Sequence, residues 1–118
     1  MISPLKQLQY DMCRLTARLI DKAIELGHLP RLGEALRTPE QAALNAKKGT
    51  GSRNSLHQDR LAIDLLLDNP DGTWYTDTEH YRTLGEWWKQ QHPAAAWGGD
   101  FRTRPDGNHF SLSYEGRR

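Results

Sequence analysis

The sequence has little cysteine, no excess of either charge and no long hydrophobic run. Cys13 is the one cysteine among 118 residues, which excludes an internal disulfide. Its place within a helical pattern predicts a small buried side chain rather than a nucleophile. The 16 basic residues nearly balance the 15 acidic ones, and no segment of the sequence contains a dense cluster of Lys and Arg. We therefore expect no nucleic-acid partner that depends on bulk charge.

Two kinds of membrane signal are also missing from the sequence. No apolar run approaches the roughly 18 residues of a membrane helix. The N-terminus lacks the basic and apolar stretches of a signal peptide. We therefore expect no membrane insertion and a product that begins in the cytoplasm. The length favours a single domain over residues 1–118, which we expect to be a monomer.

Hydrophobic periodicity predicts three helices. The first covers residues 3–27, with Ser3 as its N-cap. Thr38 can cap a second helix that ends near residue 46, and the third covers residues 78–91 up to a following proline. These helices alternate with short extended segments rather than following one another directly.

The remaining segments predict a small sheet. Residues 61–67 (LAIDLLL) are nearly all apolar, as in a strand buried on both faces. Shorter extended segments are expected at 32–36 and 109–113, with a polar loop at 47–55 and a turn at 69–73. The order of elements indicates an α+β domain with a small, mostly antiparallel sheet.

The stretch SLHQDRLAID, residues 55–64, contains His57 and Asp64, whose separation depends on the path of the chain between them. A straight strand would hold His57 and Asp64 roughly 23 Å apart. A reversal over residues 58–60 would bring them together. A carboxylate in a buried strand is costly unless it is paired or bound to a metal. An ion pair with an arginine is the simpler interpretation of this stretch alone.

A second polar motif, PDGNHF, occupies residues 105–110. His109 would complete a set of three protein ligands, which is what catalytic zinc requires. Asp106 is then placed as a general base that is not itself a ligand. Taken singly, Asp106 is better explained as a turn residue and His109 as an ordinary strand residue. The other histidines, at positions 28, 80 and 92, have no partner at a familiar ligand spacing.

The four tryptophans favour packing over substrate binding. Trp87 and Trp88 are adjacent in a helix, so we expect one in the core and the other partly exposed. Trp74 and Trp97 lie in or near predicted loops, where aromatic rings can stack on sugars but more often cover a core edge. We expect Trp97 to be an additional contact for the substrate.

These motifs resemble those of one peptidase family. The shared pattern is Ser55-x-His57…Ala62-x-Asp64 followed by Asp106-x-x-His109. It resembles the zinc peptidases of the D-alanyl-D-alanine carboxypeptidase and L-alanyl-D-glutamate endopeptidase family, and the small bacteriophage endolysins in particular. The stretches LGEALRTPEQ, HQDRLAIDL, LGEWW and WGGDF…DGNHF are also similar, so the resemblance covers about residues 5–110.

The resemblance implies an α+β zinc-peptidase fold with about three helices, shared in outline with the hedgehog signalling domain. It implies one zinc ion held by His57, Asp64 and His109, with water as the fourth ligand. Asp106 would take a proton from that water and pass it to the leaving amine.

The resemblance also implies roles for two residues outside the ligand set. Ser55 would lie in the substrate cleft or around the ligands. Arg37 would hold a substrate carboxylate or polarise the scissile carbonyl, a task that suits its fork of donors. An ion pair of Arg37 with Glu34 or Asp64 is an equally supported alternative.

Two departures from the family pattern bear on specificity. Arg60 stands where the family usually has glycine, so we expect ordinary backbone dihedrals in this turn. Asp106 and the His109–Phe110 pair stand where carboxypeptidases usually have Glu and Trp-His, which points to the endopeptidase branch.

The expected function is a zinc-dependent peptidoglycan peptidase, a phage endolysin that cuts the L-Ala–D-Glu bond of stem peptides. It would be made in the host cytoplasm and reach the cell wall through a membrane hole formed by another protein. The alternatives are a D,D-carboxypeptidase or dipeptidase, and a non-catalytic zinc-stabilised binding module.

Overall fold

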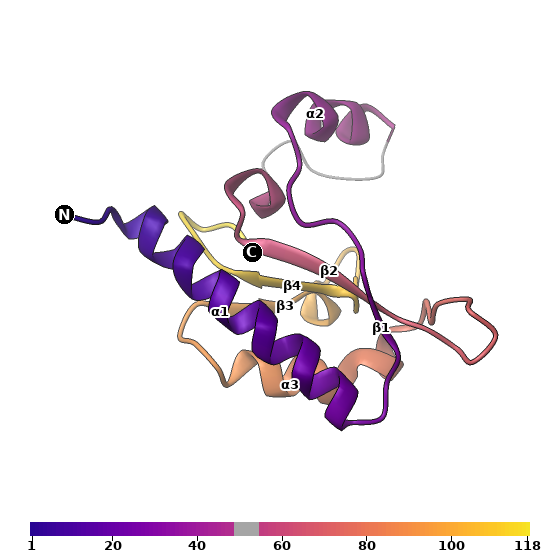
Figure 1. The fold of residues 1–118 in the computed structure, drawn as a ribbon. Coiled ribbons are helices and arrows are strands. Elements are labelled where there is room, and N and C mark those ends of the chain that lie inside the picture. The colour runs from indigo at the N-terminus through magenta and orange to yellow at the C-terminus, as the bar shows by residue number, and fades with distance from the viewer. Residues whose placement is uncertain (49–54) are drawn as a thin grey trace.

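The computed structural model describes residues 1–48 and 55–118, so most of the predicted 47–55 loop lies outside the described residues. The chain forms an α+β fold, which confirms the predicted class (Figure 1). Three 3₁₀ turns accompany the helices and strands, at Leu56–Asp59, Thr78–Tyr81 and Gly98–Asp100. The helices and strands are α1 (Pro4–Glu25), β1 (Pro30–Leu32), α2 (Pro39–Lys47), β2 (Ala62–Leu67), α3 (Arg82–Lys89), β3 (Ala95–Trp97) and β4 (His109–Leu112).

Helix α1 begins and ends as its capping residues predict. The Ser3 hydroxyl accepts a hydrogen bond from the Lys6 amide, and Gly27 takes a positive φ of 88° beyond the last turn. The helix buries one apolar stripe, comprising Met12, Leu15, Leu19 and Ala23. Cys13 is exposed, so the prediction of a buried thiol was wrong. Successive helical residues are about 100° apart around the axis, and Met12 occupies the buried direction.

The sheet has four antiparallel strands in the order β1-β2-β4-β3. Helix α1 runs diagonally across it and α3 packs beside β3, so both helices lie over the sheet in Figure 1. Side chains alternate between the two faces of a strand. Phe110 of β4 contacts Trp88 of α3 edge to face, which identifies the helix-covered side. His109 and its cross-strand partner Asp64 therefore point to the opposite side.

Strand β1 is displaced from the segment predicted at 32–36. It pairs Pro30–Leu32 with the end of β2, and two further backbone hydrogen bonds follow it. The Gly33 amide donates to the Asp64 carbonyl at 2.8 Å, and the Asp64 amide donates to the Glu34 carbonyl at 2.8 Å. A Cβ at residue 33 would lie 2.9 Å from the Asp64 carbonyl oxygen, so glycine permits this close approach.

The third helix is shorter than predicted, because its first turn is the 3₁₀ turn Thr78–Tyr81 and α3 ends at Lys89. Trp88 is buried and Trp87 partly so, as expected. Trp97 lies in β3, a strand that the sequence did not predict, and is 1% exposed. Its ring nitrogen donates to the Gly107 carbonyl at 2.7 Å. Trp97 is thus a core residue and cannot stack on a substrate, which corrects that expectation.

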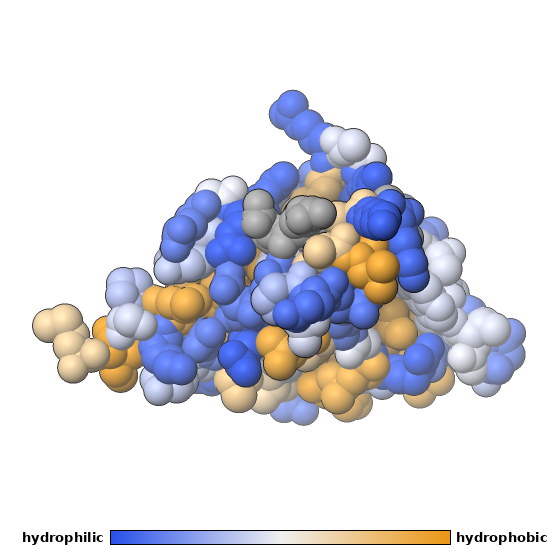
Figure 2. Space-filling view, turned by 90° about the horizontal axis from the view of Figure 1, so that it is seen from above, coloured by the Kyte–Doolittle hydropathy of each residue, from blue (hydrophilic) through white to orange (hydrophobic). Residues whose placement is uncertain are grey.

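The described helices include no segment long and apolar enough to span a bilayer. Seen from above, the surface is mainly hydrophilic, and its hydrophobic groups are separated by polar side chains (Figure 2).

Candidate metal and catalytic site

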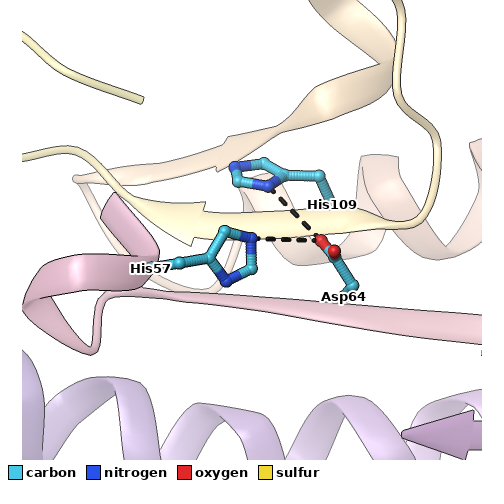
Figure 3. Close-up of side chains that lie close together, drawn as sticks. All are labelled: His57, Asp64 and His109. Carbon is cyan, nitrogen blue, oxygen red and sulfur yellow. Dashed lines mark ion pairs between the residues drawn. The ribbon is translucent and has the colours of Figure 1, made fainter. Parts of the chain in front are cut away.

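Three side chains from two strands and a turn converge on the open face of the sheet. His57 comes from the turn before β2, while Asp64 and His109 are paired across β2 and β4. Asp64 Oδ1 lies 3.3 Å from His57 Nε2 and 3.6 Å from His109 Nδ1 (Figure 3). The three donor atoms all lie within 4.8 Å of one another. Two imidazole nitrogens and a carboxylate oxygen form a donor set that suits zinc.

The polar contacts of this cluster fit a metal better than a closed hydrogen-bond network. Asp64 Oδ1 is buried and has no hydrogen-bond partner, although two imidazoles face it. The Ala35 carbonyl lies 3.2 Å from His57 Nδ1 and can only accept, so the proton sits on Nδ1 and Nε2 is left as a donor atom for a metal. Buried polar atoms are rarely left unpaired without a reason. A cation at the centre would satisfy all three groups.

The turn that carries His57 is built by its flanking residues. The Ser55 hydroxyl caps it by accepting from the His57 amide at 3.2 Å. Arg60 ends it in the left-handed region, at φ 58° and ψ 32°. The expectation of ordinary dihedrals at Arg60 was therefore wrong. The left-handed conformation of Arg60 redirects the chain from the 3₁₀ turn toward β2, which begins at Ala62.

Two distant side chains hold the same turn. Gln9 of α1 donates to the Asp59 carbonyl at 2.8 Å. Arg117 pairs with the Asp59 carboxylate at 2.5 Å. The turn with His57 is thereby attached to the first helix and to the C-terminal segment. The sequence contained no local signal for either contact, because the partners are 50 and 58 residues apart.

The loop before His109 places Asp106 beside the cluster through backbone contacts. The Asp106 amide donates to the Gly98 carbonyl at 2.8 Å, and the His109 amide donates to the Asp106 carbonyl at 3.1 Å. A Cβ on Gly98 would lie 2.1 Å from the Asp106 carbonyl oxygen and 2.8 Å from His109 Cβ. Gly98 therefore allows the loop to close against β3. The sequence does not mark Gly98, rather than the adjacent Gly99, as the residue that contacts the loop before His109, because this contact depends on tertiary packing.

The charges of the cluster shift its pKa values. Burial alone would raise the pKa of Asp64, but contacts with His109 and His57 outweigh it and lower the value to about 2. Burial opposes protonation of His57, yet Asp64 raises the pKa of His57 overall. Residue Asp106 as a whole is exposed, but its carboxyl group is partly buried. This burial is the larger cause, and repulsion from Asp64 the second, of the raised pKa of Asp106. A partly buried carboxyl group with a raised pKa is suited to accept a proton.

Arg37 makes the ion pair that was one of its two predicted roles. Its Nε contacts the Glu34 carboxylate, and its side chain is 10% exposed. The positive charge of Arg37 also acts on Asp106 and opposes the rise of its pKa. The pairing with Glu34 therefore holds the guanidinium near the cluster.

The remaining histidines lie away from this cluster. His80 pairs with Asp77 at 2.6 Å and stacks on Tyr75. His92 pairs with Asp11 of α1 at 3.0 Å. His28 is half-buried after the end of α1. Within residues 1–48 and 55–118, the His57, Asp64 and His109 group is the one set of three that could hold a metal.

The fold is an antiparallel α+β domain with a candidate two-histidine, one-carboxylate metal site on the face of the sheet away from α3. The family model described as D-alanyl-D-alanine carboxypeptidase, of the M15 peptidases, matches residues 48–112, more than half of the chain. The chain belongs to this family. A search of curated proteins gave no match.

Among solved structures, the fold is similar to that of the L-Ala D-Glu endopeptidase ChiX of Serratia marcescens. The TM-score is 0.68 at 19% sequence identity, and the match covers 96% of this chain and 89% of the other. The likeness establishes the M15 peptidase-like fold over nearly the whole chain.

Proposed function

We propose that the protein is a zinc-dependent peptidoglycan peptidase that hydrolyses the L-Ala–D-Glu bond of stem peptides. The observation that carries this proposal is the convergence of His57 Nε2, Asp64 Oδ1 and His109 Nδ1 around an unpaired carboxylate oxygen. Membership of the M15 peptidases and the fold of an L-Ala D-Glu endopeptidase support it.

The three ligands would come from the residues just named. A bound zinc ion would lower the pKa of water and act as a Lewis acid toward a peptide carbonyl. Asp106 is positioned by Gly98 and held next to the cluster. Its carboxylate oxygen takes a proton from the attacking water and later delivers it to the amine of the leaving half. The raised pKa of Asp106 makes its carboxylate a stronger base, which favours the first of these transfers.

Arg37 is proposed to orient the substrate. Its Nε is engaged by Glu34, which fixes the plane of the guanidinium group. The group's other donors can bind a substrate carboxylate or the oxygen of the scissile carbonyl. Ser55 acts by capping the turn that carries His57, and the cleft role of its hydroxyl remains a proposal.

A second function is favoured by the description of the family itself. A D,D-carboxypeptidase would use the same zinc ligands and base, but would require a terminal carboxylate next to the cleaved bond. The Asp at position 106 and the Phe after His109 are the residues that favour the endopeptidase. A non-catalytic zinc-stabilised module would have no use for Asp106.

We further propose that the protein is a bacteriophage endolysin, with antimicrobial activity against the host wall. It would act as a single domain after another phage protein opens the membrane. Digestion of purified peptidoglycan, with identification of the new amino ends, tests the reaction. New D-glutamate amino ends are the expected product. Released D-alanine would show the carboxypeptidase instead.

A further inference from the structure

The position of the Asp106 carboxylate depends on the backbone of its loop. Within residues 1–48 and 55–118, no hydrogen bond or ion pair involves this carboxylate. The Asp106 amide donates to the Gly98 carbonyl at 2.8 Å, and the Asp106 carbonyl accepts from the His109 amide at 3.1 Å. Any further contact that fixes this backbone therefore also fixes the carboxylate.

Gly107, the next residue of the loop, is buried and is held by two contacts. Its carbonyl accepts a hydrogen bond from the Trp97 indole N–H at 2.7 Å. A Cβ on Gly107 would lie 3.1 Å from Thr78 Cα and 3.1 Å from Tyr81 Cδ1, so the 3₁₀ turn packs closely against its α-carbon. The loop that carries Asp106 is thus seated against both the indole and this turn.

The indole of Trp97 is itself tightly enclosed. A Cβ added to Gly85 would lie 2.1 Å from its Cδ2 atom, and one added to Gly99 would lie 2.2 Å from Cζ2. The Arg82 guanidinium and the Lys89 ammonium lie 5.3 Å and 5.9 Å from the ring centroid. Cations at this range are attracted to the face of the ring. The ring therefore has one orientation, and its N–H points at the loop.

We propose that Trp97 is a positioning residue whose indole N–H fixes the loop that carries Asp106 beside the metal cluster. Its effect on rate rests on the proposed peptidase function. A general base must stay within hydrogen-bond reach of the proton that it accepts, and a misplacement of about 1 Å can cost roughly 10²-fold in rate. Because Asp106 is not among the three converging ligands, Trp97 acts on the rate and not on zinc binding.

The test removes the indole N–H of Trp97. Trp97→Phe does so with a smaller ring, and Trp97→benzothienylalanine does so with sulfur in place of the N–H on a ring system of nearly the same shape. Trp88→Phe is the matched control, because the buried Trp88 indole also donates to a backbone carbonyl, that of Ser111 at 3.1 Å. Should Trp97→Phe fail to fold, the benzothienylalanine variant carries the test.

On a stem peptide with the L-Ala–D-Glu bond, zinc-loaded Trp97 variants should lose roughly 10- to 100-fold in kcat, with KM changed by less than about twofold. Zinc affinity, measured by competition with a chelating dye, should match the wild type. Trp88→Phe should lower Tm but keep kcat. In an Asp106→Asn background, the benzothienylalanine change should cause no further loss, because the group that it positions is gone.

Amide hydrogen exchange separates the positioning from the reaction. Exchange of the Asp106 amide should be about tenfold faster in the Trp97 variants, and unchanged in Trp88→Phe. If the wild type cuts no stem peptide but this exchange is faster, the positioning stands and the proposed reaction fails.

Three results would overturn the assignment of Trp97. The first is wild-type exchange of the Asp106 amide in the Trp97 variants, whatever their activity. The second is an unchanged kcat in these variants of an active protein. The third is an equal loss of kcat in Trp88→Phe or a further loss in the Asp106→Asn background, because either would show a general structural effect.

Discussion

Asp64 and His109 are direct cross-strand partners in β2 and β4, and Asp64 Oδ1 lies 3.6 Å from His109 Nδ1. Because paired residues share a face, this register fixes two donor atoms on one rigid support. Asp64 Oδ1 is nevertheless without a hydrogen bond. The cluster is therefore expected to be stabilised by a cation.

The first prediction concerns metal content. The purified chain should hold about one zinc ion, and His109→Ala should abolish tight binding because it removes one of three ligands. Zinc at about 1,000 times its Kd should stabilise the fold by about 4 kcal/mol, so a chelator should lower Tm. Elemental analysis and thermal unfolding measure both effects. His80→Ala, which alters an exposed pair with Asp77, is the control. Full zinc content in the His109 variant would contradict the ligand assignment.

The second prediction separates metal binding from catalysis. Asp106→Asn should retain zinc, because Asp106 is not among the three converging ligands. Its peptidase rate should fall roughly 10²- to 10⁴-fold, the range expected for loss of a general base. Asp21→Asn, on the exposed surface of α1, should leave the rate unchanged. A fully active Asp106 variant would show that another group accepts the proton.

The third prediction tests the close contact beneath the loop. Gly98→Ala would force a methyl group to within 2.1 Å of the Asp106 carbonyl oxygen. The loop must shift, at a cost of about 1–3 kcal/mol in unfolding free energy, and zinc affinity should fall with it. Gly72→Ala is a useful contrast, because its φ is 90° but no atom lies within 4 Å of the added Cβ. It should lower stability without changing zinc affinity, as measured by competition with a chelating dye.

The fourth prediction concerns the left-handed residue before β2. Arg60→Gly should relieve backbone strain at φ 58°, and part of the gain is offset by the greater freedom of glycine in the unfolded chain. A net gain of up to about 1 kcal/mol is expected in chemical unfolding. Arg60→Ala removes the same side chain but keeps the strain, so it isolates the backbone effect. An alanine variant more stable than the glycine variant would refute this explanation.

The fifth prediction uses the pair between α1 and the end of α3. His92 Nε2 lies 3.0 Å from Asp11 Oδ2, and this hydrogen bond holds the pKa of Asp11 below its ordinary value of 3.8. A lowered pKa stabilises the fold above that ordinary value, and the contribution disappears as pH falls through the folded-state pKa. Wild type should therefore exceed Asp11→Asn in unfolding free energy at about pH 5, and the difference should shrink toward about pH 2. A difference that stays constant over this range would rule out the linkage.

Local chemistry was sufficient to predict several elements. The Ser3 cap and the Gly27 stop bracket α1, and the apolar run at 61–67 forms β2. Strand β3 was missed because its three residues, AAW, are too few to show the alternation that identifies a strand. The strand at 32–36 was displaced because hydrogen bonding to β2 set its position, not its own side chains.

Local patterns also predict some features of the candidate site, while contacts between distant residues decide others. His57, Asp64, Asp106 and His109 are visible in the sequence, because unusual polar residues flank or interrupt apolar runs. The pairing of Arg37 with Glu34 follows from their spacing of three residues. The Asp59 contacts of Gln9 and Arg117, by contrast, join residues 50 and 58 positions apart. Such contacts depend on the packing of α1 and the C-terminal segment against the same turn.

The sequence by itself determined the fold class and the N-caps of α1 and α2, because these depend on side-chain chemistry and short spacings. It indicated His57, Asp64 and His109 as a ligand set only through the resemblance to a peptidase family. The tertiary structure decided which atoms converge. The β2–β4 register placed Asp64 opposite His109, and a left-handed Arg60 returned His57 to the same face. Packing also placed Trp97 in the core and the Phe101 ring beside the His109 ring. Register and packing arise from contacts between distant segments, and no local pattern encodes them.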